Sequence, residues 1–444
     1  MEIPVIKVGI MAEQVISLTL HGNYLLENPG VIISGPCKAG KSGTEIYFES
    51  GSQKWFLHSN LNLIPVDSKI GKFTLHDVTI GINFHWERKE DQVFNGSLCF
   101  LSEGNKVRAI NIISIEDYLL SVISSEMSAT SSMEFLKAHA VISRSWLLAQ
   151  VLKNQNLQMD PHEYKTTFQT KDELVRWYDR EDHLYFDVCA DDHCQRYQGI
   201  TSATTGLIET AVQESCGEVL LYNGLICDAR FSKCCGGVTE LFENVWEPVN
   251  HPYLQNVVDN SSHSEVFSGE LTHEEAARHW IRHKPDVFCN SSDKNILKQV
   301  LNDYDQETND FFRWQVIYTQ EKLSNLVKSR TGIDFGNIVE LIPLERGVSG
   351  RLIKLKIVGT LRTMTVGKEL EIRKTLSESH LYSSAFVIDK QEAEGSVNFI
   401  LSGAGWGHGV GLCQIGAAVM GDKGYNYSEI LSHYFKEARI ENIY

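Results

Sequence analysis

Apolar and polar residues alternate in short runs through the first part of the chain. The runs VIKVGIM, GVIISG, TEIYFES and SLCFLS follow this pattern, and Gly, Asn and Asp residues separate them. A period of two is typical of β-strands that bury one face. The pattern therefore predicts a β-rich region over residues 1–105.

The period of the pattern changes after Ile113. The segment IEDYLLSVISSEM predicts a short helix that ends near Met127. A longer helix follows and runs to about Leu152, because its apolar residues recur at helical spacing. Ser131 and Glu134 have the spacing of a capping box at the start of this second helix.

Three further changes of pattern divide the rest of the chain. Residues 206–232 return to strand-like segments. Residues 262–330 contain the polar, amphipathic stretches ELTHEEAARHWIRHK and NILKQVLNDYDQE, which predict a helical insertion. After the insertion, strands lead through a helix at 368–376 and a glycine-rich loop to a helix at 415–423.

Together these elements predict an α+β fold. We expect a mixed, β-rich core with a catalytic helical segment, a helical insertion, and an active-site cleft between lobes. The predicted units are an N-terminal β-rich region at 1–105 and a second domain at 106–444.

Composition narrows the class of protein. The chain has 444 residues, a formal net charge of −16 and 42% hydrophobic residues. The negative charge argues against nucleic acid as a partner, since phosphate binding needs clustered Lys and Arg. We expect no membrane span, because no apolar run is long enough to cross a bilayer. The first residues lack the basic start of a signal peptide, so the chain as written is expected in the cytoplasm, or in the cell envelope if its N-terminus is truncated.

The densest group of candidate site residues lies in the segment SGAGWGHGVGLCQIG. Six glycines occur from Gly403 to Gly416, together with Trp406, His408 and Gln414. Glycine lets a backbone adopt positive φ and approach a ligand closely. The alternative is a glycine-rich loop that leads into a helix, with His408 there by chance.

A second candidate is the acid Glu126, in the segment SSEMSATSS. A single glutamate at a helix end is usually exposed to solvent and has no function. The hypothesis that Glu126 is a site residue therefore depends on the helix that follows. Lys137 and Arg144 lie seven residues apart in that helix, and hence on one face. Two cations on that face either bind an anion or orient a carboxylate, or they form a solvated stripe.

Four side chains that can bind metal occur within twelve residues of sequence. His183, Cys189, His193 and Cys194 can supply the two nitrogens and two sulfurs of a tetrahedral zinc site. Their spacing is unlike that of zinc fingers, and adjacent ligands strain the geometry. His162 is a spare candidate. The ten cysteines of the chain are too scattered for a disulfide scaffold, so reduced thiols and one metal site are expected.

The segment FSKCCGGVTELFENVW joins two adjacent cysteines to a Gly-Gly turn. Adjacent cysteines indicate metal or redox chemistry. Ser232 and Thr239, on either side of Gly236 and Gly237, would instead line a sugar-binding cleft. The simplest alternative is a tight hairpin.

The order and rough spacing of these motifs resemble the stage II sporulation protein D family, also called the amidase-enhancer family. The matching segments are IEDYLLSVISSEM, LKAHAVISRSWLLAQ, CQRYQG, FSKCCGGVTELFENVW, RGVSGRLIKLKIVG and GWGHGVGLCQIGAAVMGDKGYNYSEILSHYF. The resemblance covers residues 106–444, of which 262–330 are partly unmatched.

The resemblance implies a lytic transglycosylase, which cleaves the MurNAc–GlcNAc bond of peptidoglycan and leaves a 1,6-anhydro product. The catalytic acid of such enzymes matches Glu126, and some members bind zinc through a region that matches residues 183–194. The substrate would be peptidoglycan glycan strands or fragments. Its expected contacts are Lys137, Arg144, Ser232, His408, Gly409 and Gln414, with packing beside the site as the alternative for Lys137 and Arg144.

The sequence departs from the family pattern at three places. The family usually has Gln where this chain has His139, and a Ser/Thr-rich strand where this chain has Lys233, Cys234 and Cys235. Cys413 stands between the glycine loop and its glutamine. Two alternatives to the enzyme remain open, namely a glycan-binding module that stimulates a cell-wall amidase and a cytoplasmic enzyme that acts on recycled cell-wall fragments.

Overall fold

The computed structural model is a mixed α/β protein in which strands predominate, so the prediction of a β-rich mixed fold is confirmed. The described residues are 3–58, 60–81, 87–128, 131–159, 166–177, 183, 185–191, 193–200, 206–261, 270–300, 310–393 and 396–444.

The helices are α1 (Ile115–Glu126), α2 (Met133–Met159), α3 (Gly206–Glu214), α4 (Glu274–Arg282), α5 (Lys294–Val300), α6 (Gln320–Thr331), α7 (Glu369–Thr375), α8 (Gln414–Asp422), α9 (Tyr427–Tyr434) and the 3-10 turn η1 (Phe242–Asn244). The strands are β1 (Val5–Glu13), β2 (Val15–Leu26), β3 (Val31–Ser42), β4 (Glu45–Ser50), β5 (Gln53–Leu57), β6 (Leu61–Pro65), β7 (Lys72–Ile80), β8 (Arg88–Asn95), β9 (Ser97–Glu103), β10 (Lys106–Ser114), β11 (Thr167–Gln169), β12 (Glu173–Arg176), β13 (Val188–Cys189), β14 (Glu218–Tyr222), β15 (Leu225–Ile226), β16 (Phe231–Ser232), β17 (Arg313–Thr319), β18 (Ile338–Arg346), β19 (Leu352–Gly359), β20 (Thr363–Gly367), β21 (Phe386–Ala393), β22 (Ser396–Ala404), β23 (Leu412–Cys413) and β24 (Arg439–Asn442).

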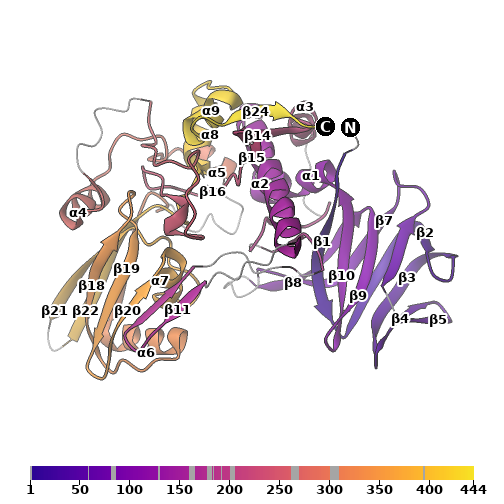
Figure 1. The fold of residues 1–444 in the computed structure, drawn as a ribbon, viewed down its shortest axis with the longest axis horizontal. Coiled ribbons are helices and arrows are strands. Elements are labelled where there is room, and N and C mark those ends of the chain that lie inside the picture. The colour runs from indigo at the N-terminus through magenta and orange to yellow at the C-terminus, as the bar shows by residue number, and fades with distance from the viewer. Residues whose placement is uncertain are drawn as a thin grey trace.

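The largest sheet contains the first ten strands and lies at one end of the molecule, in indigo and purple in Figure 1. Its strand order is β13-β1-β10-β9-β6-β2-β3-β4-β5, and β7 and β8 branch from β2. Val8, Leu18 and Phe48 are among the alternate residues that it buries, as the period of two predicted. The division predicted at residue 105 falls at the turn between β9 and β10, within this sheet.

Two smaller sheets lie at the opposite end of the molecule (Figure 1). Their strand orders are β11-β12-β20-β19-β18 and β17-β22-β21, and α6 packs against strands of both. Strand β17 corrects the prediction for residues 262–330, because this stretch contains a strand as well as helices α4 and α5. Trp314 of β17 pairs with Gly403 of β22, so the strand adjoins the start of the glycine loop.

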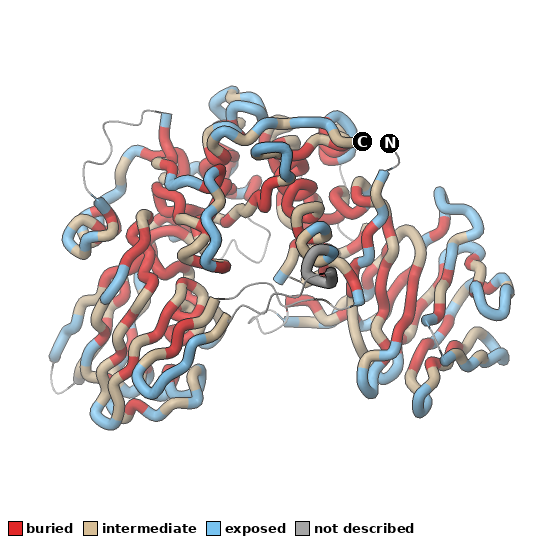
Figure 2. The backbone as a smooth tube through the Cα atoms, viewed as in Figure 1, coloured by how far each residue is buried: buried red, intermediate tan, exposed pale blue. Residues whose placement is uncertain are grey.

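A layer of helices joins the two ends, and α2 lies at its centre (Figures 1 and 2). Every residue of α2 from 138 to 147 is buried. Helices α1, α3, α8 and α9 pack around it. Helices α1 and α8 confirm the two helices that were predicted to end near Met127 and to occupy 415–423. Among the described residues, no helix is both long enough and apolar enough to cross a membrane.

Two local predictions are wrong. Helix α3 occupies the first part of a segment that was predicted to contain only strands. The capping box at Ser131 does not form, because Ser131 Oγ instead donates a hydrogen bond to the carbonyl of Gln299 at 3.0 Å. Ser132 Oγ takes the capping position and accepts from the backbone N–H of Phe135 at 3.3 Å.

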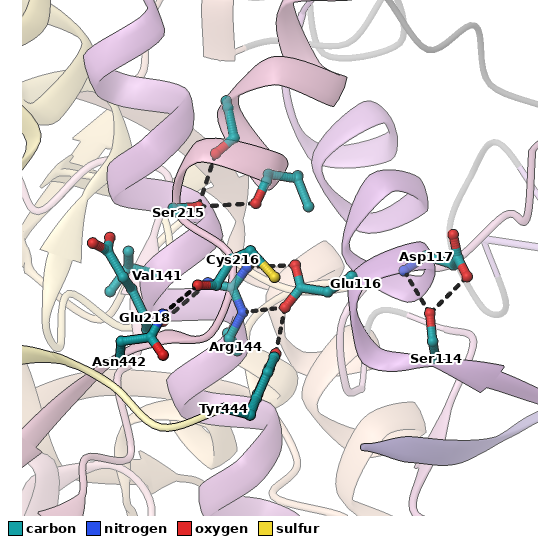
Figure 3. Close-up of polar contacts among 12 residues, drawn as sticks. Ser114, Glu116, Asp117, Val141, Arg144, Ser215, Cys216, Glu218, Asn442 and Tyr444 are labelled. Atoms are coloured by element: carbon teal, nitrogen blue, oxygen red, sulfur yellow. Dashed lines mark hydrogen bonds and ion pairs between the residues drawn. The ribbon is translucent and has the colours of Figure 1, made fainter. Parts of the chain in front are cut away.

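A buried ion pair joins α1 to α2 (Figure 3). Arg144 of α2 is fully buried, and its Nε and Nη2 donate to the two carboxylate oxygens of Glu116 at 2.8 and 2.7 Å. Its Nη1 donates to the carbonyl of Glu218 in β14 at 2.9 Å. The hydroxyl of Tyr444 also donates to Glu116. This placement supports a structural role for Arg144, where the sequence suggested a glycan contact.

Replacing Arg144 with alanine is expected to lower the free energy of unfolding by about 3–5 kcal/mol, because Glu116 would keep a charge without its partner. The matched control is Lys137→Ala on the same helix, since Lys137 pairs at 2.5 Å with the largely exposed Glu214. An exposed pair contributes less than about 1 kcal/mol. Urea unfolding of both variants measures the difference, and equal losses would contradict this assignment.

Candidate functional site

Glu126 is the last residue of α1, and its carboxylate is partly buried. Its Oε1 accepts a hydrogen bond from the backbone N–H of Arg196, with 3.4 Å between the atoms. The neighbouring Ser125 and Met127 are buried, so the carboxylate lies at the border between the core and the surface. This is a suitable position for an acid that must reach a substrate.

The structure brings together the four metal-binding residues that the sequence predicted. The ligand atoms of His183, Cys189, His193 and Cys194 all lie within 4.8 Å of one another. Cys194 Sγ is 3.4 Å from His183 Nε2 and 3.6 Å from His193 Nδ1. Two imidazoles and two thiols at these separations fit the donor set of a tetrahedral zinc site. His162, the spare candidate, lies outside the described residues.

The electrostatics of this cluster favour a cation. Cys194 lowers the pKa of the Cys189 thiol to about 2, against the opposing effect of burial and with smaller contributions from His183 and His193. The backbone N–H of Cys189 donates to Cys194 Sγ at 3.4 Å. Because the thiolate is the form of cysteine that binds metal, these contacts prepare the cluster for a metal ion.

The segment that follows the cluster runs along α1 from Glu126 toward Ser121. The backbone N–H of Gln198 donates to Ser121 Oγ at 3.1 Å. Two residues earlier, the backbone N–H of Arg196 donates to Glu126. The backbone donor that contacts the candidate acid therefore lies two residues after Cys194, the last residue of the cluster.

Strand β1 anchors the other side of the cluster. Gly9 of β1 pairs with Cys189 of β13, and the backbone N–H of Ala190 donates to the Gly9 carbonyl at 3.0 Å. A Cβ at Gly9 would lie 2.7 Å from ring atoms of Phe186. Glycine is needed at this position, because the segment that carries the metal ligands lies directly against the first sheet.

The glycine loop packs against the Cys-Cys-Gly-Gly segment of its own chain. Cys234 and Trp406 exchange two backbone hydrogen bonds of 3.0 and 2.8 Å. Strands β16 and β23 pair just beyond them. Alternate positions of the loop have positive φ, which favours glycine. These positions are Gly405, Gly407, Gly409 and Gly411.

The space beside these glycines is filled by the protein. A Cβ at Gly409 would lie 2.3 Å from Cζ of the buried Arg351, and a Cβ at Gly411 would lie 2.1 Å from the carbonyl oxygen of Arg230. The sequence suggested that a sugar would lie next to Gly409. Packing against Arg351 is itself sufficient to require glycine at this position.

His408 is occupied by contacts within the protein. Its Nδ1 accepts from the backbone N–H of Val410 at 3.0 Å, and the ring also hydrogen-bonds to the backbone of Phe231. The ring lies edge-to-face against Trp246, with centroids 5.1 Å apart. Burial, with nearby cations such as Arg230, lowers the pKa of His408 well below its usual range. These contacts favour a neutral His408 imidazole whose role is to hold the conformation of the glycine loop.

Gln414 begins α8 and points into the core, with 2% of its surface exposed. Its Nε2 is 3.1 Å from Nε2 of His139, whose Nδ1 is 3.2 Å from Ser143 Oγ. With the Gln414 amide nitrogen as the donor, His139 Nε2 accepts and the proton of the ring is assigned to Nδ1. Burial, with a contribution from Lys233, lowers the pKa of His139 to about 3. Gln414 is thus held inside the protein, where a glycan contact had been expected.

Ser232 and Thr239, the hydroxyl candidates of the hairpin, are both buried. Thr239 Oγ1 accepts from the backbone N–H of Val257 at 2.7 Å and donates to the carbonyl of Gln255 at 3.1 Å. Ser232 lies beside Gly407 of the glycine loop. These placements favour packing roles for both hydroxyls.

The segment after Glu126 and the Cys-Cys hairpin meet at the end of α5. The backbone N–H of Ser128 donates to the carbonyl of Gln299 at 2.9 Å, and Lys233 Nζ donates to the carbonyl of Val300 at 2.7 Å. Lys233 was not among the site residues predicted from the sequence. The available signal was its departure from the Ser/Thr-rich pattern of the family.

Comparison with known proteins supports the same family. Residues 103–222, which include Glu126 and the metal cluster, match the model of the Stage II sporulation protein family. Residues 240–411 match a Domain of unknown function (DUF8618). An uncharacterized protein of Brachyspira hyodysenteriae is 28% identical over 342 residues, which are 77% of this chain and 70% of that protein.

Two relatives from Bacillus subtilis have functional names. The Amidase enhancer is 25% identical over 241 residues, 51% of this chain and 31% of its own length. Stage II sporulation protein D is 30% identical over 152 residues, 34% of this chain and 40% of its own length. The chain therefore spans less than half of either protein. Residues 103–222 form a SpoIID domain, and the chain is similar to members of the stage II sporulation protein D and amidase-enhancer family.

Removing two ligands of the metal cluster is expected to remove about one equivalent of zinc, because two remaining ligands bind zinc weakly. The variant is Cys189→Ser/Cys194→Ser, and elemental analysis of protein produced with zinc measures the loss. Cys216→Ser is the control, since Cys216 is also partly buried but lies outside the cluster. Equal zinc in wild type and in the double variant would contradict the site.

His139 is expected to make stability sensitive to acid. Its folded pKa of about 3 lies below the ordinary value of about 6.5, so the unfolded chain binds more protons between these values. Stability is therefore lost as pH falls, by about 2 kcal/mol from pH 7 to pH 5. His139→Gln should remove this loss, whereas the exposed His58→Gln should not. Urea unfolding at the two pH values is the measurement, and parallel losses in wild type and His139→Gln would refute the assignment.

Proposed function

We propose that the protein is a lytic transglycosylase that cleaves the MurNAc–GlcNAc bond of peptidoglycan glycan strands or fragments. The observation that carries this proposal is the position of Glu126. Its carboxylate lies at the border of the core, and Arg196, next to the candidate metal centre, donates a backbone hydrogen bond to it. In this proposal the glycan binds beside Glu126, in the predicted cleft between the lobes.

One carboxyl group is sufficient for this reaction. Protonated Glu126 gives its proton to the glycosidic oxygen, and the bond from C1 to that oxygen breaks as an oxocarbenium-like state develops. The glutamate, now ionised, takes the proton of the C6 hydroxyl of the muramic acid. The C6 oxygen then closes on C1, which gives the 1,6-anhydro sugar and returns the proton to Glu126.

The metal centre has a supporting role in this proposal. Four protein ligands leave no open position for water, so zinc bound by His183, Cys189, His193 and Cys194 would be structural. It would hold the segment that contains Arg196 against α1. The placements described above favour packing roles for Arg144, Gly409 and Gln414, so the proposal does not depend on them.

A second candidate function is a glycan-binding protein that stimulates a cell-wall amidase without cleaving glycan. The observation in its favour is the relative named Amidase enhancer. Both candidates bind the same polymer, so they differ only in whether Glu126 transfers a proton. Chemical analysis of the reaction products therefore separates them.

Glu126→Gln is expected to lower turnover of purified glycan strands by ~10²–10⁴, because the amide keeps the shape of the side chain and cannot transfer the proton. The matched control is Glu134→Gln. Glu134 is also partly buried and accepts a backbone hydrogen bond, from Tyr427 at 2.8 Å. The control should keep the rate of the wild type.

Mass spectrometry of the products decides between the functions. A 1,6-anhydro end supports the transglycosylase, and a reducing end would identify a hydrolase instead. Glycan binding without any cleavage by the wild type would favour the amidase enhancer. Undiminished product release by Glu126→Gln would remove Glu126 from the mechanism.

A further inference from the structure

A second group of metal-binding side chains is buried between the Cys-Cys hairpin and helix α8. Cys235, Asp259, Cys289 and Cys413 are each at most 2% exposed. Their ligand atoms all lie within 4.8 Å of one another. The four residues come from separate parts of the chain, and folding alone brings them together.

The distances between the sulfurs fit one metal ion. Cys235 Sγ and Cys289 Sγ are 3.6 Å apart. Two thiolates on a tetrahedral zinc ion, each at ~2.3 Å, lie about 3.8 Å apart, whereas the sulfurs of a disulfide lie about 2.05 Å apart. Ligand atoms within 4.8 Å of one another enclose a single ion and leave no room for an iron–sulfur cluster.

Backbone donors point at the sulfurs, as is expected where thiolates are stabilised. The N–H of Cys235 donates to Cys413 Sγ at 3.2 Å, and the N–H of Gly237 donates to Cys235 Sγ at 3.4 Å. Cys413 is also the N-cap residue of α8. A helix N-terminus favours negative charge and hence the thiolate.

The carboxylate of Asp259 is buried and oriented. Its Oδ2 accepts from the backbone N–H of Cys289 at 2.9 Å, and its Oδ1 accepts from the hydroxyl of Tyr434 at 2.6 Å. A carboxylate that is fully buried beside three thiols is unfavourable unless a cation accompanies it.

Positive charge is also present beside the group. Arg313 interacts electrostatically with Cys289 and with the adjacent pair Cys234 and Cys235. Its Nη1 donates to the carbonyl of Gly236 at 3.1 Å. Three thiolates and one carboxylate with a divalent ion have a net charge of −2, and the guanidinium offsets part of it.

We propose that Cys235, Asp259, Cys289 and Cys413 form a second metal centre that binds one zinc ion. It is separate from the centre at His183–Cys194 and does not depend on the proposed glycan chemistry. On binding, the three thiols and any protonated carboxyl release their protons to solvent. The neighbouring Cys234 is buried beside the sulfurs but is not a ligand.

The position of this centre gives it a structural task. Cys235 belongs to the hairpin that the glycine loop packs against, Cys413 ends that loop, and Cys289 lies in the stretch between α4 and α5. One ion would cross-link these three segments. The loop around His408 is then held in place by a metal ion as well as by packing.

The test uses a background that lacks the first centre, Cys189→Ser/Cys194→Ser. We expect elemental analysis to find about one zinc per folded chain, and none after Cys289→Ser or Asp259→Asn is added. The control variants are Cys227→Ser and Cys234→Ala. Both cysteines are buried, but Cys227 lies outside the group and Cys234 lies beside it. Both should keep the zinc.

Several results would overturn the proposal. Folded background protein without zinc would exclude the centre, and loss of zinc in Cys234→Ala would refute the ligand assignment. A disulfide between Cys235 and Cys289, detected by peptide mass spectrometry, would identify a redox pair instead. If the Cys289 variant fails to fold, cobalt replacement in the background protein gives a second measurement. Intense visible bands with thiolate-to-cobalt charge transfer support a tetrahedral thiolate site, and a weak octahedral spectrum contradicts it.

Discussion

Helix α2 places consecutive polar side chains in the middle of the protein, and each of them must find a partner there. His139, Ser143, Arg144 and Ser145 are all fully buried. His139 is paired through Gln414 with α8, Arg144 binds α1 and β14, and Ser145 Oγ accepts from the backbone of β14 at 2.8 Å. The elements around α2 are therefore positioned by directional contacts as well as by apolar packing. This requirement explains why polar residues on this helix serve the fold, although they look like site residues in the sequence.

The sequence was informative about the fold wherever the pattern is local. Helix α1 and the first strands follow from their periods, because one face of each element is buried. Strand β17 was missed because its short sequence RWQVIYT lies among polar segments with a helical pattern, and its partner β22 begins at Ser396, far along the chain. The cap of α2 was misplaced by one residue, since Ser131 has a tertiary partner in Gln299 that no local rule can reveal.

The same distinction applies to the candidate site. The cluster from His183 to Cys194 was predictable, because its ligands lie close together in sequence. The role of Arg144 was not, because the sequence gives no sign that Glu116 on another helix neutralises it. The glycine loop was recognised as unusual, but its backbone approaches Arg351 and Arg230 of the same protein. A high density of glycine therefore indicates that the backbone of a loop comes close to other atoms. It does not tell whether those atoms belong to a ligand or to the protein itself.

The contact between Tyr444 and Glu116 has a consequence for how the protein folds during synthesis. These residues are separated by 328 positions, and strand β24 nearby pairs with β14. The first ten strands need only the earliest part of the chain, so most of their sheet can form on the ribosome. The contacts that residues 439–444 make with β14 and with Glu116 can form only after these last residues have been synthesised, so they are late additions to the helical layer.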